Sequence, residues 1–154
     1  MGKALNLVQE PARDVPASDS PATARVPVPR SRYGAALIVD DEPMIRKLAV
    51  CLLPKHGLPV LEAGNGREAI DRLARDGAEV RAVLLDMAMP EMSGDVALPI
   101  IRQLRPDIRV IVSSGFHDRD VEQRFRHIAA RSFLPKPYTR GKLLAELVPA
   151  VSLS

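Results

Sequence analysis

The sequence predicts an α/β domain in which a doubly wound, five-stranded parallel sheet carries helices on both faces. Five short apolar runs rich in Val, Ile, Leu and Ala each precede a segment with helical periodicity. This alternation favours parallel strands joined by right-handed helical crossovers. Acidic, hydroxyl and lysine residues follow the apolar runs, and in such sheets the functional site lies beyond the carboxyl ends of the strands.

The first strand–helix unit begins at residues 35–39, an uninterrupted apolar run typical of a strand that is buried on both faces. Pro43 is suited to the first turn of the helix that follows. Pro54 and Gly57 predict the end of this helix, because proline interrupts helical hydrogen bonds and glycine favours a left-handed cap. Apolar residues at helical spacing predict its buried stripe: Met44, Leu48, Cys51 and Leu52.

The second unit comprises a strand at residues 58–63 and a helix at 67–75, separated by the turn Gly64-Asn65-Gly66. Pro59 predicts an edge position for this strand, because proline cannot donate a hydrogen bond to a neighbouring strand. Gly77 is expected to end the helix.

The third and fourth units repeat this plan, with strands at residues 82–85 and 108–113. Helices are expected at about 94–104 and 118–129. The first of them should bend at Pro99, which lacks an amide donor.

The fifth unit has a short strand at residues 132–134 and a final helix that Thr139 can cap with its hydroxyl group. Four apolar residues form one stripe along this helix: Leu143, Leu144, Leu147 and Val148.

Composition and charge limit the class of protein. Residues 1–33 hold five of the 14 prolines and no sustained period, which predicts a flexible tail before a folded domain at 34–154. The net charge of +3 is too small to indicate nucleic-acid binding by itself. A single cysteine, Cys51, excludes an internal disulfide, fits a cytoplasmic location and is expected in the core. No apolar run approaches the ~20 residues of a membrane span.

Carboxylates follow two strands that should be neighbours. With a strand order of 2-1-3-4-5, the first and third strands bring Asp40, Asp41 and Asp86 together. Two carboxylates about 4 Å apart repel by roughly 4 kcal/mol at an effective dielectric constant of 20. Mg²⁺ offsets such repulsion and suits a site with few carboxylates and an incoming phosphate. Glu42 is interpreted instead as an N-cap of the first helix.

Two further groups lie at the same edge of the predicted sheet. The fourth strand ends in Ser113-Ser114-Gly115, where a hydroxyl group can donate to a phosphoryl oxygen. Lys136 follows the fifth strand and should face the carboxylates. Pro137 keeps the preceding lysine out of helical geometry.

Four motifs at successive strand ends together resemble the receiver domain of two-component response regulators. The resemblance covers about residues 35–150 and implies a flavodoxin-like fold. The motifs are VDDE at 39–42, LLDMAMPEMSG at 84–94, VSSG at 112–115 and FLPKP at 133–137.

The resemblance implies a role for each matching residue. Asp86 would accept the phosphoryl group, Lys136 would pair with it, and a cis Lys136–Pro137 bond is expected. Ser114 would follow the phosphate inward by its hydroxyl group, and Phe133 would change rotamer with it. Mg²⁺ would be held by four ligands: Asp40 through water, Asp41, Asp86 and the backbone carbonyl of Ala88.

The same resemblance implies partners and kinetics. A histidine kinase or a histidine phosphotransfer protein would supply the phosphoryl group, and output would pass to an unknown protein through the helix 4–strand 5–helix 5 face. Dimerisation through that face stays open, whereas direct DNA binding and membrane contact are not expected. Ala88 and Phe116 offer no polar side chain to orient a water molecule, which predicts at most slow autophosphatase activity.

Two other classes remain as alternatives. A haloacid-dehalogenase-like phosphatase also uses an aspartate at a strand end with Mg²⁺, but it would want an acid where Ala88 stands. A pseudo-receiver would bind partners without phosphorylation, against which the intact Asp41, Asp86, Ser114 and Lys136 argue. A detached receiver of a hybrid histidine kinase and a stand-alone regulator both fit the sequence.

Overall fold

A computed structural model of the chain describes residues 34–115, 123 and 132–152. One parallel sheet has the strand order β2-β1-β3-β4-β5, which confirms the predicted fold class and order. The predicted tail at 1–33 and the predicted helix at 118–129 lie outside this description, apart from residue 123. The strands are β1 Ala35–Val39, β2 Val60–Ala63, β3 Val80–Asp86, β4 Arg109–Ser114 and β5 Ser132–Pro135. The helices are α1 Pro43–Leu52, α2 Gly66–Asp76, α3 Gly94–Leu104 and α5 Arg140–Val151.

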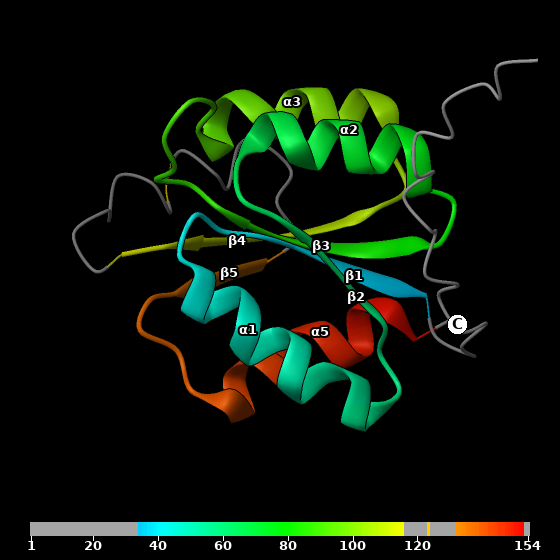
Figure 1. Cartoon of the computed structure of the whole chain (residues 1–154), viewed down its shortest axis with the longest axis vertical. Helices are drawn as coiled ribbons and strands as arrows, with labels where there is room; N and C mark the ends of the chain where they lie inside the picture. Colours follow the sequence, from blue (N-terminus) through cyan, green and yellow to red (C-terminus); the bar gives the residue numbers. More distant parts are fainter. Residues whose placement is uncertain (1–33, 116–122, 124–131, 153–154) are drawn as a thin grey trace, which may run out of the picture.

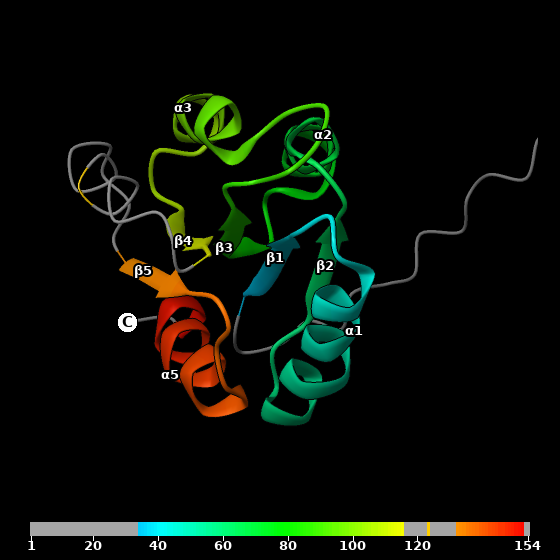
Figure 2. The same ribbon diagram turned by 90° about the vertical axis from the view of Figure 1, so that its left-hand side faces the viewer.

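The helices cover both faces of the sheet. Helices α2 and α3 lie on one face, and α1 and α5 lie on the other (Figures 1 and 2). Each face has its own apolar core, because side chains of a strand point alternately to the two sides. Thus Val83 and Leu85 of β3 belong to the α2/α3 core, whereas Ala82 and Leu84 belong to the α1/α5 core.

Local sequence signals set the ends of several elements. A 3₁₀ turn at Leu53–His56 follows α1, and Gly57 ends it with a φ of 79°. The side chains of Asn65 and Thr139 accept hydrogen bonds from the first-turn amides of α2 and α5. Pro59 lies just before β2, which is an edge strand as predicted.

The predicted buried stripe of α1 is wrong for two of its four residues. Leu48 is partly buried, and Leu52 packs, partly buried, against the α1/α5 core. Met44 is 72% exposed and Cys51 is also exposed, so Cys51 is not a core residue. The helix instead packs through Ala49, and Leu53 continues this buried face beyond its last turn. The apolar residues of α1 cover two adjoining faces of the helix, and the face that contains Ala49 is the buried one.

Helix α3 has the predicted bounds and continues through Pro99, which lies on its exposed side. In α5 the predicted leucine stripe is confirmed, with Leu143 and Leu147 buried. Among the described residues, no helix is long and apolar enough to cross a membrane.

A matched pair of substitutions on α3 tests the core assignment. Leu98 is fully buried, whereas Val96 on the same helix is 50% exposed. Leu98→Ala should lower the free energy of unfolding by about 2–5 kcal/mol, because it leaves a cavity in the α2/α3 core. Val96→Ala should change it by no more than about 0.5 kcal/mol. Urea unfolding followed by circular dichroism measures both, and equal effects would contradict the packing described here.

Candidate functional site

The alternation of side chains along the strands places three charged groups on one face of the sheet edge. Ile38, Leu84 and Leu134 belong to the α1/α5 core and precede Asp40, Asp86 and Lys136 by two positions each. Because the strands are parallel and adjacent side chains alternate, residues two positions further point to the same side. The three charges therefore converge at the carboxyl ends of β1, β3 and β5.

Lys136 bridges the two buried carboxylates. Its Nζ atom lies 2.7 Å from Oδ2 of Asp40 and 3.0 Å from Oδ2 of Asp86. The side chains of Asp40 and Asp86 are only 3% and 4% exposed, and that of Lys136 is 16% exposed. Buried carboxylates need such a partner, since an unpaired charge in the interior costs several kcal/mol.

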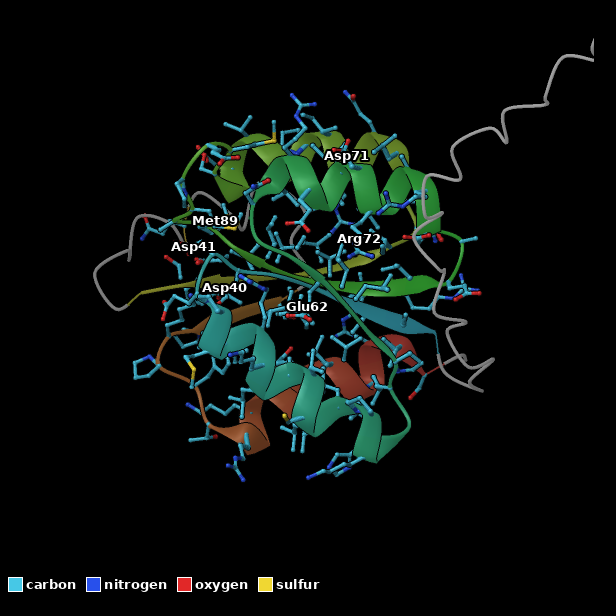
Figure 3. All side chains as sticks on the ribbon, viewed as in Figure 1. Asp40, Asp41, Glu62, Asp71, Arg72 and Met89 are labelled. Atoms are coloured by element: carbon cyan, nitrogen blue, oxygen red, sulfur yellow. The ribbon has the colours of Figure 1, made fainter. Side chains whose placement is uncertain are left out.

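Asp41 adds a third carboxylate that is open to solvent. Carboxylate oxygens of Asp40, Asp41 and Asp86 all lie within 4.8 Å of one another. Figure 3 shows Asp40 and Asp41 at the end of the sheet from which α1 starts. A set of closely spaced carboxylate oxygens, one side of which faces water, fits a hard divalent cation that keeps several water ligands.

Backbone carbonyls at the end of β4 accept hydrogen bonds from the residues that follow β3 and β5. The carbonyl of Ser113 accepts a hydrogen bond from the amide of Met87 at 3.0 Å. The carbonyl of Ser114 accepts one from the amide of Lys136 at 2.7 Å. Ser114 is fully buried, and the Lys136–Pro137 bond is cis as expected.

Phe133 lies on the opposite side of the sheet from Lys136. It pairs with Val112 in the β4–β5 register and packs, partly buried, against the α2/α3 core. The register and the alternation place Ser114 on the same side as Val112. The two predicted switch residues, Ser114 and Phe133, therefore lie on neighbouring strands near the same end.

The loop after Asp86 is held by backbone hydrogen bonds. The amide of Ala88 donates to Oδ1 of Asp86 at 3.2 Å, and Ala88 is itself exposed. The amide of Gly94 donates to the carbonyl of Met87 at 3.2 Å. The amide of Gly66 donates to the carbonyl of Met92 at 3.1 Å. The loop after Asp86 is thus tied to the start of α3 and to the start of α2.

Burial and charge shift two pKa values in the site. Burial raises the pKa of Asp86, and the neighbouring Asp40 adds to this, whereas the hydrogen bond and charge of Lys136 oppose it. For Lys136, burial acts to lower the pKa, but its hydrogen bonds with Asp40 and Asp86 outweigh burial and raise it. The lysine is therefore charged throughout the physiological range.

Sequence reasoning missed the contacts of Glu42 and Arg46. Glu42 lies at the N-cap position of α1 as interpreted, yet within the described helix its side chain makes no capping hydrogen bond. Its Oε1 atom lies 3.5 Å from Nζ of Lys136. Arg46 donates to the backbone carbonyl of Asp40 at 2.7 Å. The run of three acids before Pro43 was the available signal for Glu42, and no local pattern indicated Arg46.

Known proteins share this fold and sequence. A family model of the response regulator receiver domain matches residues 36–148. The sensor kinase CckA of Brucella abortus is 33% identical over 138 residues, which are 89% of this chain and 15% of the kinase. The chemotaxis protein CheY of Bacillus subtilis is 31% identical over 109 residues, which are 70% of this chain and 89% of CheY. A chain of the CheX–CheY–BeF3–Mg²⁺ complex of Borrelia burgdorferi superposes with a TM-score of 0.70 at 26% identity, covering 75% of this chain and 87% of that chain.

The chain therefore belongs to the response regulator receiver domain family, whose members are signalling modules of two-component systems. This confirms the resemblance inferred from the four motifs. The chain spans only 15% of the length of the sensor kinase that it matches.

The raised pKa of Asp86 predicts a stabilising substitution. Between the ordinary pKa of 3.8 and the higher value in the folded protein, the folded state binds more protons than the unfolded state. Stability must then fall as the pH rises through this window. Asp86→Asn removes the ionisable group, so it should unfold at a higher urea concentration than the wild type at pH 7. This gain should disappear as the pH falls below about 3.8.

Asp71→Asn is the control for this substitution, because Asp71 is an exposed carboxylate on α2 (Figure 3). It should leave the urea midpoint at pH 7 close to that of the wild type. An Asp86→Asn protein that is less stable than the wild type at pH 7 would contradict the direction of the pKa shift.

Proposed function

We propose that this chain accepts a phosphoryl group on Asp86 from a phosphohistidine in a two-component phosphorelay. The observation that supports it best is the pairing of a buried Asp86 with Lys136 at 3.0 Å, beside two further carboxylates at the sheet edge. Membership of the receiver family supports the same chemistry. The donor would be a histidine kinase or a histidine phosphotransfer protein.

In the proposed reaction, a carboxylate oxygen of Asp86 attacks the phosphorus atom of the phosphohistidine. The new O–P bond forms as the N–P bond breaks, and the imidazole nitrogen keeps the electron pair. Lys136 stays protonated and pairs with a phosphoryl oxygen, and the hydroxyl group of Ser114 donates to another. Such transfers need positioning and charge neutralisation more than covalent chemistry, and residues fixed at a rigid sheet edge supply both.

Four groups of this chain would hold Mg²⁺: Asp40 through water, Asp41, Asp86 and the carbonyl of Ala88. The closely spaced carboxylate oxygens and the exposed position of Ala88 fit this ligand set. When bound, the cation would neutralise charge on the phosphoryl oxygens. A haloacid-dehalogenase-like phosphatase would need a second acidic residue two positions after Asp86, and this position holds Ala88.

The output would pass through protein contacts. Movement of Ser114 towards the phosphate and a rotamer change of Phe133 would alter the face formed by helix 4, β5 and α5, where a protein partner or a second copy could bind. Helix 4 lies outside the described residues. We further propose a cytoplasmic module without direct DNA contact, comprising a folded domain at 34–154 and a tail at 1–33.

Acetyl phosphate tests the acceptor. Incubation with Mg²⁺ and acetyl phosphate should add the mass of one phosphoryl group to the intact wild-type protein. Asp86→Asn should prevent this addition, because the attacking carboxylate is gone. Lys136→Met should slow it strongly, and chelation of Mg²⁺ should abolish it. Equal modification of the wild type and Asp86→Asn would place the acceptor elsewhere.

Magnesium should stabilise the folded protein. At a Mg²⁺ concentration ten times its dissociation constant, the free energy of unfolding should rise by about 1.4 kcal/mol, because the ion binds the folded state. Asp41→Asn should reduce this gain, since it removes a ligand open to solvent. Thermal unfolding with and without Mg²⁺ measures it, with equal ionic strength as the control.

Dephosphorylation should be slow. Ala88 is exposed beside Asp86 but offers no polar atom on its side chain to orient a water molecule. The phosphoryl group should then last for minutes or longer, and Ala88→Asn should shorten this lifetime. Intact mass after removal of the donor gives the rate. A wild-type lifetime of a few seconds would refute this explanation; Phe116, the other residue on which it rests, lies outside the described residues.

A further inference from the structure

The side chain of Glu42 makes a contact that its place at the helix end does not explain. Its backbone is fixed on both sides, since its amide donates to Oδ1 of Asp40 at 2.9 Å and its carbonyl accepts from the amide of Ile45 at 3.1 Å. The carboxylate takes no part in capping the described helix α1. It reaches the ammonium group of Lys136 instead, at 3.5 Å.

All three donors of Lys136 thus have a carboxylate within reach. An ammonium group has three N–H bonds and no acceptor. Its neighbours are Asp40 at 2.7 Å, Asp86 at 3.0 Å and Glu42 at 3.5 Å. Before the O–P bond forms, Asp86 is still a charged carboxylate, so a phosphoryl oxygen that binds Lys136 at that stage must displace one of the three.

Exposure decides which carboxylate is displaced. The side chains of Asp40 and Asp86 are 3% and 4% exposed, whereas that of Glu42 is 61% exposed. A buried carboxylate that loses its partner is strongly destabilised. An exposed carboxylate is hydrated at once, and its ion pair contributes little. Glu42 has the longest contact with Lys136 and the most exposed side chain of the three carboxylates. Its contact with Lys136 is therefore the one that the phosphoryl group breaks.

We propose that Glu42 is a positioning residue that forms an ion pair with Lys136 in the unphosphorylated protein and is displaced by the incoming phosphoryl group. The inference rests on the proposed function of Asp86. In this role Glu42 opposes phosphorylation in two ways. Its contact with Lys136 must be broken, and its charge repels an anionic donor at the mouth of the site.

Two substitutions separate the contact from the charge. Glu42→Gln removes the charge, whereas Glu42→Asp keeps the charge but shortens the reach by one methylene group. At saturating Mg²⁺, Glu42→Gln should react with acetyl phosphate roughly two- to five-fold faster than the wild type. Glu42→Asp should also be faster than the wild type, though by less. Asp71→Asn, which removes an exposed carboxylate on α2, is the matched control and should leave the rate unchanged.

A binding affinity measured at equilibrium complements the reaction rate. The affinity for beryllium trifluoride with Mg²⁺, a non-covalent mimic of the phosphoryl group, should rise in the same order, as measured by NMR titration. A general effect on folding would not produce this order, and urea midpoints show whether each variant is folded.

The outcomes are distinct. Faster reaction and tighter binding in both Glu42 variants, with Asp71→Asn unchanged, support the proposal. A Glu42→Gln protein that matches or lags the wild type overturns it. A Glu42→Asp protein that equals the wild type, beside a faster Glu42→Gln, leaves only a charge effect and overturns the contact with Lys136. If the wild type itself gains no phosphoryl group, the proposed function fails, which is a separate result.

Discussion

One ammonium group shared by two buried carboxylates is the interaction on which this site depends. Lys136 lies 2.7 Å from Asp40 and 3.0 Å from Asp86, and both carboxylates are almost fully buried. Without the lysine, two like charges would face each other away from water, which is strongly unfavourable. Even with it, the two carboxylates outnumber the one amine, and Asp41 and Glu42 add two further negative charges nearby. This excess of negative charge is the physical reason to expect a cation at the sheet edge.

Packing of the apolar sheet holds these charged residues in fixed positions. The strands that end in the acids pack on both faces against helices, so their ends have little freedom to move apart. Close contacts tie the loop after Asp86 to these layers. A side chain at Gly66 would come within 2.8 Å of Met92, and one at Gly94 would meet the backbone of Asp86. The loop after Asp86 is therefore short and largely fixed by these contacts.

The fold and most of the site could be predicted from the sequence, but some side chains could not. The continuous apolar run of β1 and the edge proline before β2 are local signals, and the structure agrees with them. Helix α1 is an exception, because its sequence has apolar residues on two adjoining faces, and only packing against the sheet selects the face that contains Ala49. The exposure of Cys51 follows from the same choice. Glu42 was interpreted through its position before a helix, although its long side chain reaches a lysine far along the chain.

By itself, the sequence determined the alternating parallel α/β fold and the charged residues that follow its strands, because periodicity and residues placed directly after strands are local properties of the chain. The strand order, and with it the gathering of Asp40, Asp41, Asp86 and Lys136 at one edge, was expected from the resemblance to receiver domains. Only the tertiary structure decided which face of α1 is buried and which carboxylates contact Lys136. Such choices depend on distances between segments that are remote in sequence, and a pattern along the chain carries no measure of those distances.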